Sequence, residues 1–215
     1  MKLFSVVFFS LVSISILAQD ASRFQEEVLA IQEKYDTLWD NTKETMVFTV
    51  SSSIRLWKDL QEIYPKYQIV NTGFGGSEAS DLLTYTQELI LQYNPKKVFI
   101  YEGDNDINAN KRPKDIISVF KKIIKKIQNS NPDARIVIIS AKPSLARWHL
   151  KGKYKKLNRR FNRLCKKEQY LDYANIWNIM LDRNKLRQDL FIEDGLHMNS
   201  KGYELWDQII GNYIQ

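Results

Sequence analysis

A carboxylate and an imidazole lie three positions apart near the end of the chain, in the segment Asp194-Gly195-Leu196-His197. A neutral imidazole can remove the proton of a serine hydroxyl, and a neighbouring carboxylate can hold the imidazole in the tautomer that this requires. Gly195 allows the tight turn that would bring the two side chains together. The segment therefore predicts the acid–base pair of an acyl-transfer site, whose nucleophile must lie upstream.

Strands and helices that alternate along the chain would position these groups. Short runs of β-branched and aromatic residues predict strands at 46–50, 67–70, 97–101 and 135–139, and a weaker one at 170–173. Apolar residues at helical spacing predict helices at 21–40, 54–63, 80–92, 114–128, 153–167 and 202–213. This alternation predicts a mostly parallel five-stranded sheet with helices on both faces, a three-layer α/β/α sandwich.

Polar residues follow three of the predicted strands, at the edge of the sheet where α/β proteins bind their ligands. Ser52 follows the first strand within a run of three serines, Gly76 lies in a glycine-rich turn after the second, and Asn105 follows the third. These residues offer a hydroxyl nucleophile, a backbone N–H open to close approach and a side-chain amide donor. Together with the imidazole and the carboxylate, they supply what ester cleavage needs.

The order and context of these motifs resemble those of the SGNH, or GDSL-type, lipase/esterase superfamily, over nearly all of the chain after the N-terminal segment. The resemblance implies a flavodoxin-like SGNH hydrolase fold and a serine hydrolase that acts on ester bonds. It also implies that Ser52, Asp194 and His197 are catalytic. The implied oxyanion hole consists of the backbone N–H groups of Ser52 and Gly76 and the side-chain amide of Asn105. No cofactor or metal is expected.

The first motif departs from the family pattern. The family usually has Gly-Asp-Ser-Leu where this chain has Val50-Ser51-Ser52-Ser53. Because a β-branched residue adopts a positive φ only at a cost, we expect that Val50 is extended or that the turn is reshaped. Ser52 is the nucleophile by alignment, with Ser51 and Ser53 as alternatives. Ser53 is also expected to cap the helix that begins near Ile54.

Neighbouring polar and glycine residues have simpler expected roles. Gly73 and Gly75 are expected to form a turn. Asp106 is expected to order its own loop, and His149 to pack at the rim of the site. Asn199 is placed to cap the last helix.

The low cysteine and histidine content argues against a metal site. One cysteine and two histidines cannot form the usual zinc clusters. A calcium loop starting at Asp104 is disfavoured because its sixth position is Ala109 rather than Gly and its twelfth is Asp115 rather than Glu. Cys165 is expected to be a buried apolar residue, and as a lone cysteine it excludes an internal disulfide.

The N-terminus predicts export. Lys2 precedes an apolar run at 3–17 that is interrupted only by serines, which is typical of a secretory signal peptide. We expect a signal peptide at 1–18 with cleavage after Ala18, followed by one SGNH hydrolase domain at 19–215. No cysteine follows that could anchor a lipid. The predicted location is secreted or periplasmic, without a stable membrane span; an uncleaved N-terminal anchor is the alternative.

The formal net charge of +7 comes mainly from two lysine-rich segments. In the segment at 114–128, the lysines alternate with isoleucines at helical spacing, so they are expected to form the solvated face of a helix. The segment at 151–167 is denser and could attract an anionic surface or polysaccharide, although a solvated helix face is the simpler expectation. No nucleic-acid partner is expected, because nothing beyond the net charge supports one.

The expected function is that of a secreted serine esterase, or acylhydrolase, with a small-molecule or glycan ester as substrate. No long insertion predicts a lid or an acyl tunnel, so we expect an open cleft and short acyl groups such as acetyl, on carbohydrates. Trp57 and Trp148 could stack on a sugar, but structural roles are expected for both. The alternatives are a lysophospholipase or thioesterase of the same family, or a catalytically weakened glycan-binding module. The sequence makes no prediction of the oligomeric state.

Overall fold

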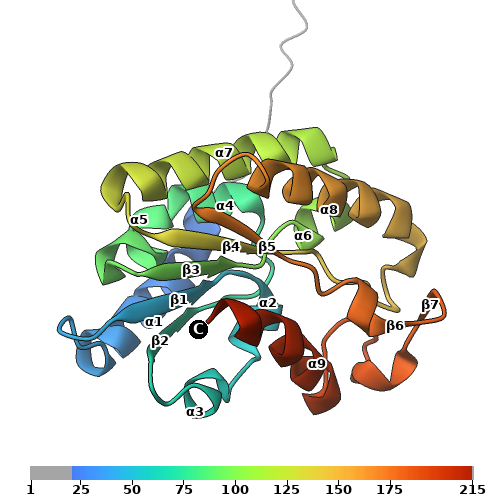
Figure 1. Ribbon diagram of the computed structural model, residues 1–215, viewed down its shortest axis with the longest axis horizontal. Helices are drawn as coiled ribbons and strands as arrows, with labels where there is room; N and C mark the ends of the chain where they lie inside the picture. Colours follow the sequence, from blue (N-terminus) through green and yellow to red (C-terminus); the bar gives the residue numbers. More distant parts are fainter. Residues whose placement is uncertain (1–20, 215) are drawn as a thin grey trace, which may run out of the picture.

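Five parallel strands run through the centre of the molecule (Figure 1). The computed structural model describes residues 21–214. The predicted signal peptide at 1–18 and its cleavage after Ala18 lie outside the described residues. The strands are β1 (Thr45–Thr49), β2 (Gln68–Thr72), β3 (Lys97–Ile100), β4 (Arg135–Ile139) and β5 (Leu171–Ala174). Their order in the sheet is β2-β1-β3-β4-β5, and every neighbouring pair is parallel, which confirms the predicted sheet.

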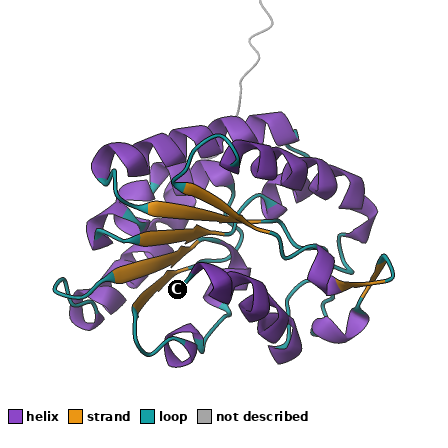
Figure 2. Ribbon diagram, viewed as in Figure 1, coloured by secondary structure: helices purple, strands orange, loops and turns teal. Residues whose placement is uncertain are grey.

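Helices cover both faces of this sheet, so the molecule has the predicted three layers (Figure 2). One layer contains α1 (Gln25–Leu38), α4 (Ala79–Thr84), α5 (Thr86–Leu89), α7 (Pro113–Ser130) and α8 (Lys151–Cys165). The opposite layer contains α2 (Ser51–Arg55), α3 (Leu60–Ile63) and α9 (Ser200–Ile210). Across residues 21–214, no helix has the length and apolar character needed to cross a bilayer.

The remaining elements are short. They are the α-helix α6 (Asp104–Asn108), the hairpin of β6 (Leu181–Asp182) and β7 (Lys185–Leu186), and the 3₁₀ helices η1 (Ala21–Phe24), η2 (Leu91–Tyr93), η3 (Trp148–Leu150), η4 (Asn178–Met180), η5 (Gln188–Leu190) and η6 (Gly211–Tyr213). Most of them lie in connections between the longer elements, and α6 directly follows the loop after β3.

Alternate strand residues pack into two apolar clusters, one on each face of the sheet. Val47 and Val98 belong to the cluster under α7 and α8. Phe48 and Phe99 belong to the cluster with α9, where their rings stack with centroids 4.2 Å apart. Because all four side chains are fully buried, the strands read in the sequence as continuous apolar runs.

The outer edge of the sheet at β2 is closed by side chains. The N–H of Ile69 donates to Oε1 of Gln61 at 2.9 Å, and the N–H of Asn71 donates to the Tyr35 hydroxyl at 2.7 Å. Tyr35 comes from α1, and Gln61 from α3. Helices from both layers thus reach the main chain of this edge strand.

The helix predicted at 54–63 is wrong in its extent. The structure has two short helices, α2 and α3, with a turn between them. Trp57 lies in that turn and is fully buried, with its indole ring 6.0 Å from that of Trp206 on α9. The free energy gained by burying this large ring against α9 outweighs that of a continuous helix through the same residues.

The helix predicted at 80–92 is also broken, into α4, α5 and η2. The Thr86 hydroxyl donates to the carbonyl of Leu82 at 2.7 Å and to that of Leu83 at 3.1 Å. Such bonds compete with the main-chain bonds of a continuous helix. The other predicted helices occur within a few residues of their expected limits. Asn199 caps α9 by accepting the N–H of Gly202 at 3.2 Å, and Cys165 is buried, as predicted.

Candidate active site

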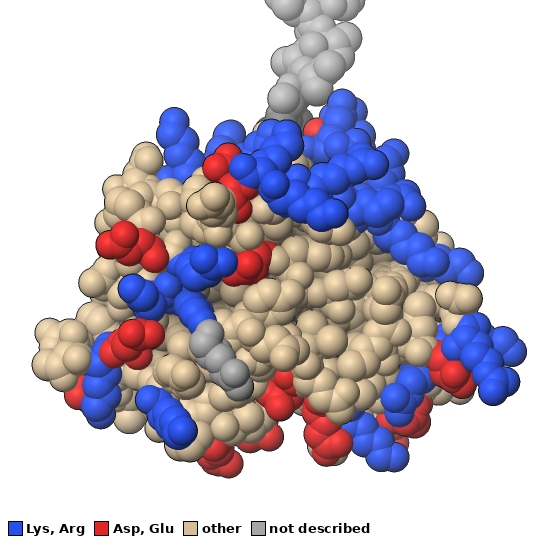
Figure 3. All heavy atoms as spheres, viewed as in Figure 1, with Lys and Arg blue, Asp and Glu red and all other residues tan. Residues whose placement is uncertain are grey.

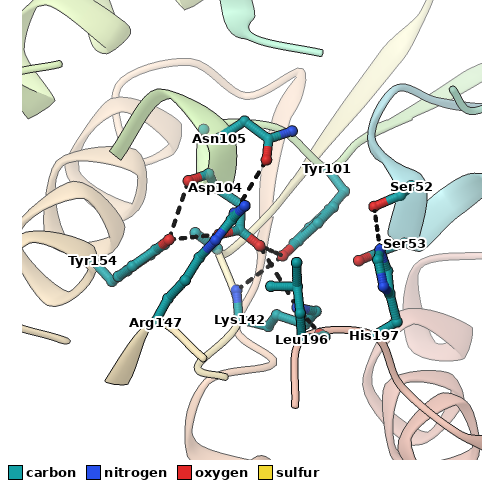
Figure 4. A network of polar contacts seen from close by, with 12 residues as sticks. Ser52, Ser53, Tyr101, Asp104, Asn105, Lys142, Arg147, Tyr154, Leu196 and His197 are labelled. Atoms are coloured by element: carbon teal, nitrogen blue, oxygen red, sulfur yellow. Dashed lines mark hydrogen bonds and ion pairs between the residues drawn. The ribbon is translucent and has the colours of Figure 1, made fainter. Parts of the chain in front are cut away.

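A chain of hydrogen bonds connects a serine, a histidine and an aspartate at the carboxyl edge of the sheet. Ser52 lies in α2, directly after β1, and Asp194 and His197 lie in the loop before α9. Ser52 Oγ is 2.8 Å from Nε2 of His197, and Nδ1 of His197 is 2.5 Å from Oδ2 of Asp194. Figure 4 shows Ser52 and His197 facing each other. With Nδ1–H donating to Asp194, the free Nε2 can accept the proton of Ser52.

A tight turn fixes the aspartate beside the histidine. Gly195 has a φ of +62°, as the spacing of the motif predicts. Oδ1 of Asp194 accepts the N–H groups of Leu196 at 2.8 Å and His197 at 2.9 Å. Partial burial would raise the pKa of Asp194, but the hydrogen bonds from His197 and Leu196 outweigh it and lower that pKa to about 2. The carboxylate therefore stays ionised at neutral pH.

The turn that carries Ser52 has an unusual backbone. Val50 has φ +60° and ψ 167°, and Ser51 has φ +65°. Of the two alternatives expected for this turn, an extended Val50 is wrong, because the residue has a positive φ. This region is costly for a β-branched residue. The Val50 side chain is completely buried in the apolar cluster under α7, which holds the conformation.

Polar groups from two other loops support the same turn. The N–H of Ser51 donates to Ser77 Oγ at 3.0 Å, and the Ser77 hydroxyl donates to Oε2 of Glu102 at 2.7 Å. Burial, reinforced by the charge of Asp106, raises the pKa of Glu102 well above its ordinary value. The loops after β1, β2 and β3 are thereby joined beneath the serine.

Ser52 is the member of the serine run that contacts His197. Ser51 and Ser53 are buried, with 2% and 3% of their surface exposed. The predicted capping role of Ser53 is wrong: α2 begins at Ser51, so Ser53 lies inside the helix, and its carbonyl accepts the Tyr203 hydroxyl at 2.9 Å.

The predicted oxyanion donors lie in adjoining loops. Gly76 is exposed with φ +77°, and Nδ2 of Asn105 donates to the carbonyl of the next residue, Ser77, at 2.8 Å. Within residues 21–214, the N–H groups of Ser52 and Gly76 have no hydrogen-bond acceptor. One N–H of the Asn105 amide is likewise unused. Three donors are therefore available for a ligand oxygen.

A buried carboxylate organises the opposite side of the site (Figure 4). Asp104 Oδ1 accepts the Tyr154 hydroxyl at 2.5 Å and Nη1 of Arg147 at 2.6 Å. The same Arg147 nitrogen donates to Oδ1 of Asn105 at 3.1 Å. Since that oxygen is engaged, the amide nitrogen of Asn105 is fixed on the side of Ser77.

Lys142 connects this carboxylate to the histidine loop. Its side chain is 1% exposed, with Nζ 3.6 Å from Oδ2 of Asp104 and 2.7 Å from the carbonyl oxygen of Leu196. Leu196 directly precedes His197. Neither Lys142 nor Arg147 was predicted from the sequence to have a role in the site. Lys142 lies three positions after β4, and no local signal marks it as buried, because its partners come from distant segments.

The other residues singled out in the sequence lie outside the hydrogen-bonded chain. His149 is exposed on η3. Asp106 was expected to order its own loop; its carboxylate pairs with Lys111 at 3.4 Å but also accepts the N–H of Ala79, at the start of α4, at 3.0 Å. In the described part of the chain, no group of three or more His, Cys, Asp or Glu side chains could hold a metal ion.

Comparison with known families gives a match over most of the chain. A model of the GDSL-like lipase/acylhydrolase family matches residues 47–205. The chain is also 23% identical over 151 residues to the N-acylneuraminate cytidylyltransferase of Escherichia coli O18:K1:H7 (strain RS218 / NMEC). That match covers 69% of this chain and 35% of the relative, so the chain spans about a third of the length of the curated relative.

Solved structures share the fold at low sequence identity. A Streptococcus pneumonia protein, provisionally described as a platelet activating factor, is 19% identical with a TM-score of 0.78, covering 90% of this chain and 95% of that chain. A GDSL-like lipase from Bacteroides thetaiotaomicron is 18% identical with a TM-score of 0.69, covering 91% and 97%. A catalytic mutant of an acetylxylan esterase from Geobacillus stearothermophilus is 12% identical with a TM-score of 0.67, covering 80% and 94%.

Replacing Lys142 tests whether it positions the histidine loop. Lys142→Met removes the donor to the Leu196 carbonyl, so we expect kcat for p-nitrophenyl acetate to fall about 10- to 100-fold with little change in KM, because small misplacements of reacting groups are costly. Arg135→Met is the control, since Arg135 pairs with Asp172 at the opposite edge of the sheet. An unchanged kcat in a folded Lys142→Met protein would contradict the prediction.

Asp106 gives a pH dependence of stability. Burial raises the pKa of Asp106 from 3.8 to about 6, against the lowering effects of the Ala79 N–H and Lys111. At pH values between the ordinary pKa and the raised pKa, the folded protein retains a proton that the unfolded chain has lost. The free energy of unfolding therefore falls as the pH rises. Relative to Asp106→Asn, the free energy of unfolding should decrease by about 1–3 kcal/mol from about pH 4 to about pH 6. Urea unfolding at several pH values in this range measures the free energy of unfolding of both proteins. The same pH dependence in the wild type and in Asp106→Asn would contradict the prediction.

Proposed function

Because the chain belongs to the GDSL-like lipase/acylhydrolase family and is an ester-hydrolysing serine hydrolase, we propose that it is a secreted esterase that removes short acyl groups, above all acetyl, from carbohydrates. Ser52, His197 and Asp194 are the proposed catalytic residues. Their hydrogen-bonded chain, with 2.8 Å between Ser52 Oγ and His197 Nε2, is the observation that carries this assignment.

In the proposed reaction, Nε2 of His197 takes the proton of Ser52 as Oγ attacks the ester carbonyl. Asp194 stabilises the imidazolium that forms and holds its ring in place. The imidazolium then protonates the leaving alcohol, which departs and leaves an acyl-enzyme on Ser52. A water molecule, deprotonated by His197, attacks the acyl carbon and releases the acid, which restores the free hydroxyl.

The negative charge on the carbonyl oxygen needs hydrogen-bond donors during both attacks. We assign this role to the N–H groups of Ser52 and Gly76 and to the side-chain amide of Asn105. Their unused hydrogens support the assignment. Removing one such donor typically lowers the rate by about 10²–10³.

Short acyl groups and carbohydrate substrates are supported by two observations. In residues 21–214, the long connection between β5 and α9 is folded into η4, the β6–β7 hairpin and η5, and the pockets that this segment lines do not include Ser52. One structure with the same fold comes from an acetylxylan esterase. Export is supported by the charged and apolar pattern of residues 1–18.

Substitution within the serine run tests the nucleophile. We expect Ser52→Ala and His197→Ala to lower kcat for p-nitrophenyl acetate by at least about 10³-fold, because each removes a member of a unit that acts together. Ser53→Ala is the matched control and should keep most of the activity, since it retains the carbonyl that accepts Tyr203. Labelling with a fluorophosphonate and mapping of the modified serine identify the nucleophile directly. Full activity in Ser52→Ala would refute the assignment.

A series of p-nitrophenyl esters tests the acyl length. We expect kcat/KM to be highest for acetate and to fall steadily beyond butyrate, because an open site offers little apolar surface to a longer chain. Retained or rising kcat/KM with a long-chain ester would favour a lipase or lysophospholipase. Activity on acyl thioesters above that on the matching oxygen esters would favour a thioesterase.

A further inference from the structure

A pocket of about 240 Å³ lies beyond β5, between α8 and the β6–β7 hairpin. Asn175, which lines it, directly follows β5. The pocket therefore opens at the carboxyl edge of the sheet, the same edge that carries Ser52 after β1. None of the residues of the hydrogen-bonded site lines it.

Side-chain amides that lack partners line this pocket. Among the described residues, the amides of Asn162, Asn178 and Asn184 make no hydrogen bond. Asn175 uses only its oxygen, which accepts the N–H of Trp177 at 3.2 Å. Unengaged amides provide donors and acceptors side by side, which is what a ligand rich in hydroxyl groups requires.

Two cations lie in the same wall. Lys155 and Arg159 are exposed, and in the described chain neither has a carboxylate within 4.0 Å. No Asp or Glu lines the pocket. All of α8 is without acidic residues, and Figure 3 shows Lys and Arg gathered over the side of the molecule where Figure 1 places α7 and α8. The local field thus favours an anion.

An aromatic wall completes the pocket. Trp177 lines the pocket, and its ring stacks on that of Trp148 with centroids 6.2 Å apart and planes at 16°. The Nζ atom of Lys155 lies 6.0 Å from the centroid of the Trp177 ring. The indole N–H of Trp177 is buried without an acceptor in residues 21–214. Because only 5% of Trp177 is exposed, it forms an apolar floor beneath the amides and cations, against which part of a negatively charged sugar ring can rest.

We propose that this pocket is a binding subsite for an acidic oligosaccharide, a sugar chain bearing carboxylate or sulfate groups. Arg159 and Lys155 bind the anionic group, the asparagine amides bind the hydroxyls, and the basic face of α8 extends the attraction along the chain. The subsite does not depend on the proposed esterase activity, because its ligand need not carry an ester.

Equilibrium binding to oligosaccharides without esters tests the proposal. We expect the wild-type protein to bind a short oligogalacturonate or a heparin oligosaccharide, and to bind a neutral xylo-oligosaccharide of equal length at least tenfold more weakly. The variant Lys155→Gln/Arg159→Gln should lose at least tenfold in affinity for the acidic chain that binds. Asn162→Leu should also weaken binding, without changing its salt dependence.

The matched control is Lys121→Gln/Lys122→Gln, which removes two exposed charges from the neighbouring helix α7. It should change the affinity less than threefold, and circular dichroism should show that all variants are folded. Equal losses in both double variants would overturn the proposal in favour of diffuse charge attraction. Equal binding of the neutral chain, or binding only to phosphatidylglycerol vesicles, would also overturn it. Loss of esterase activity in Ser52→Ala leaves these binding results unaffected, so the two proposals fail separately.

Discussion

The position of the Ser52 hydroxyl depends on a backbone turn that costs free energy to form. Val50 and Ser51 both have positive φ, in regions that cost non-glycine residues of the order of 1–3 kcal/mol. Two different kinds of interaction stabilise the turn: the buried Val50 side chain in the apolar cluster, and the bond from the Ser51 N–H to Ser77, which is itself held by Glu102. The direction of the Ser52 side chain is thus set by the core and by neighbouring loops rather than by local preference.

A single buried carboxylate joins the other parts of the site. Burial would raise the pKa of Asp104, but Lys142 and Arg147 outweigh this effect and lower it, so the group is ionised and paired. Through Arg147 it fixes the Asn105 amide, and through Lys142 it is linked to the loop of His197. Removing one partner would leave a charge unpaired in the interior, which is the expensive outcome for buried ion pairs.

The fold was predictable because parallel strands that are buried on both faces appear in the sequence as apolar runs, such as 135–139, and amphipathic helices separate them. The approach of Ser52 to His197, 145 positions later, follows from the rule that parallel strands end at one edge; the catalytic roles of the two residues are still predictions. Two features could not be predicted. The conformation of Val50 contradicts its local preference and is stabilised only by tertiary packing. Lys142 reads in isolation as a surface residue, because its partners come from distant segments.

The closed edge of β2 has a consequence for the behaviour of the protein in solution. An open sheet edge offers main-chain donors and acceptors to a strand of another molecule, which is the first step in β-aggregation. Here Gln61 and Tyr35 occupy two of those donors, so an incoming chain would have to break two internal bonds before pairing. Two ordinary polar side chains therefore oppose the addition of strands from other molecules along this edge.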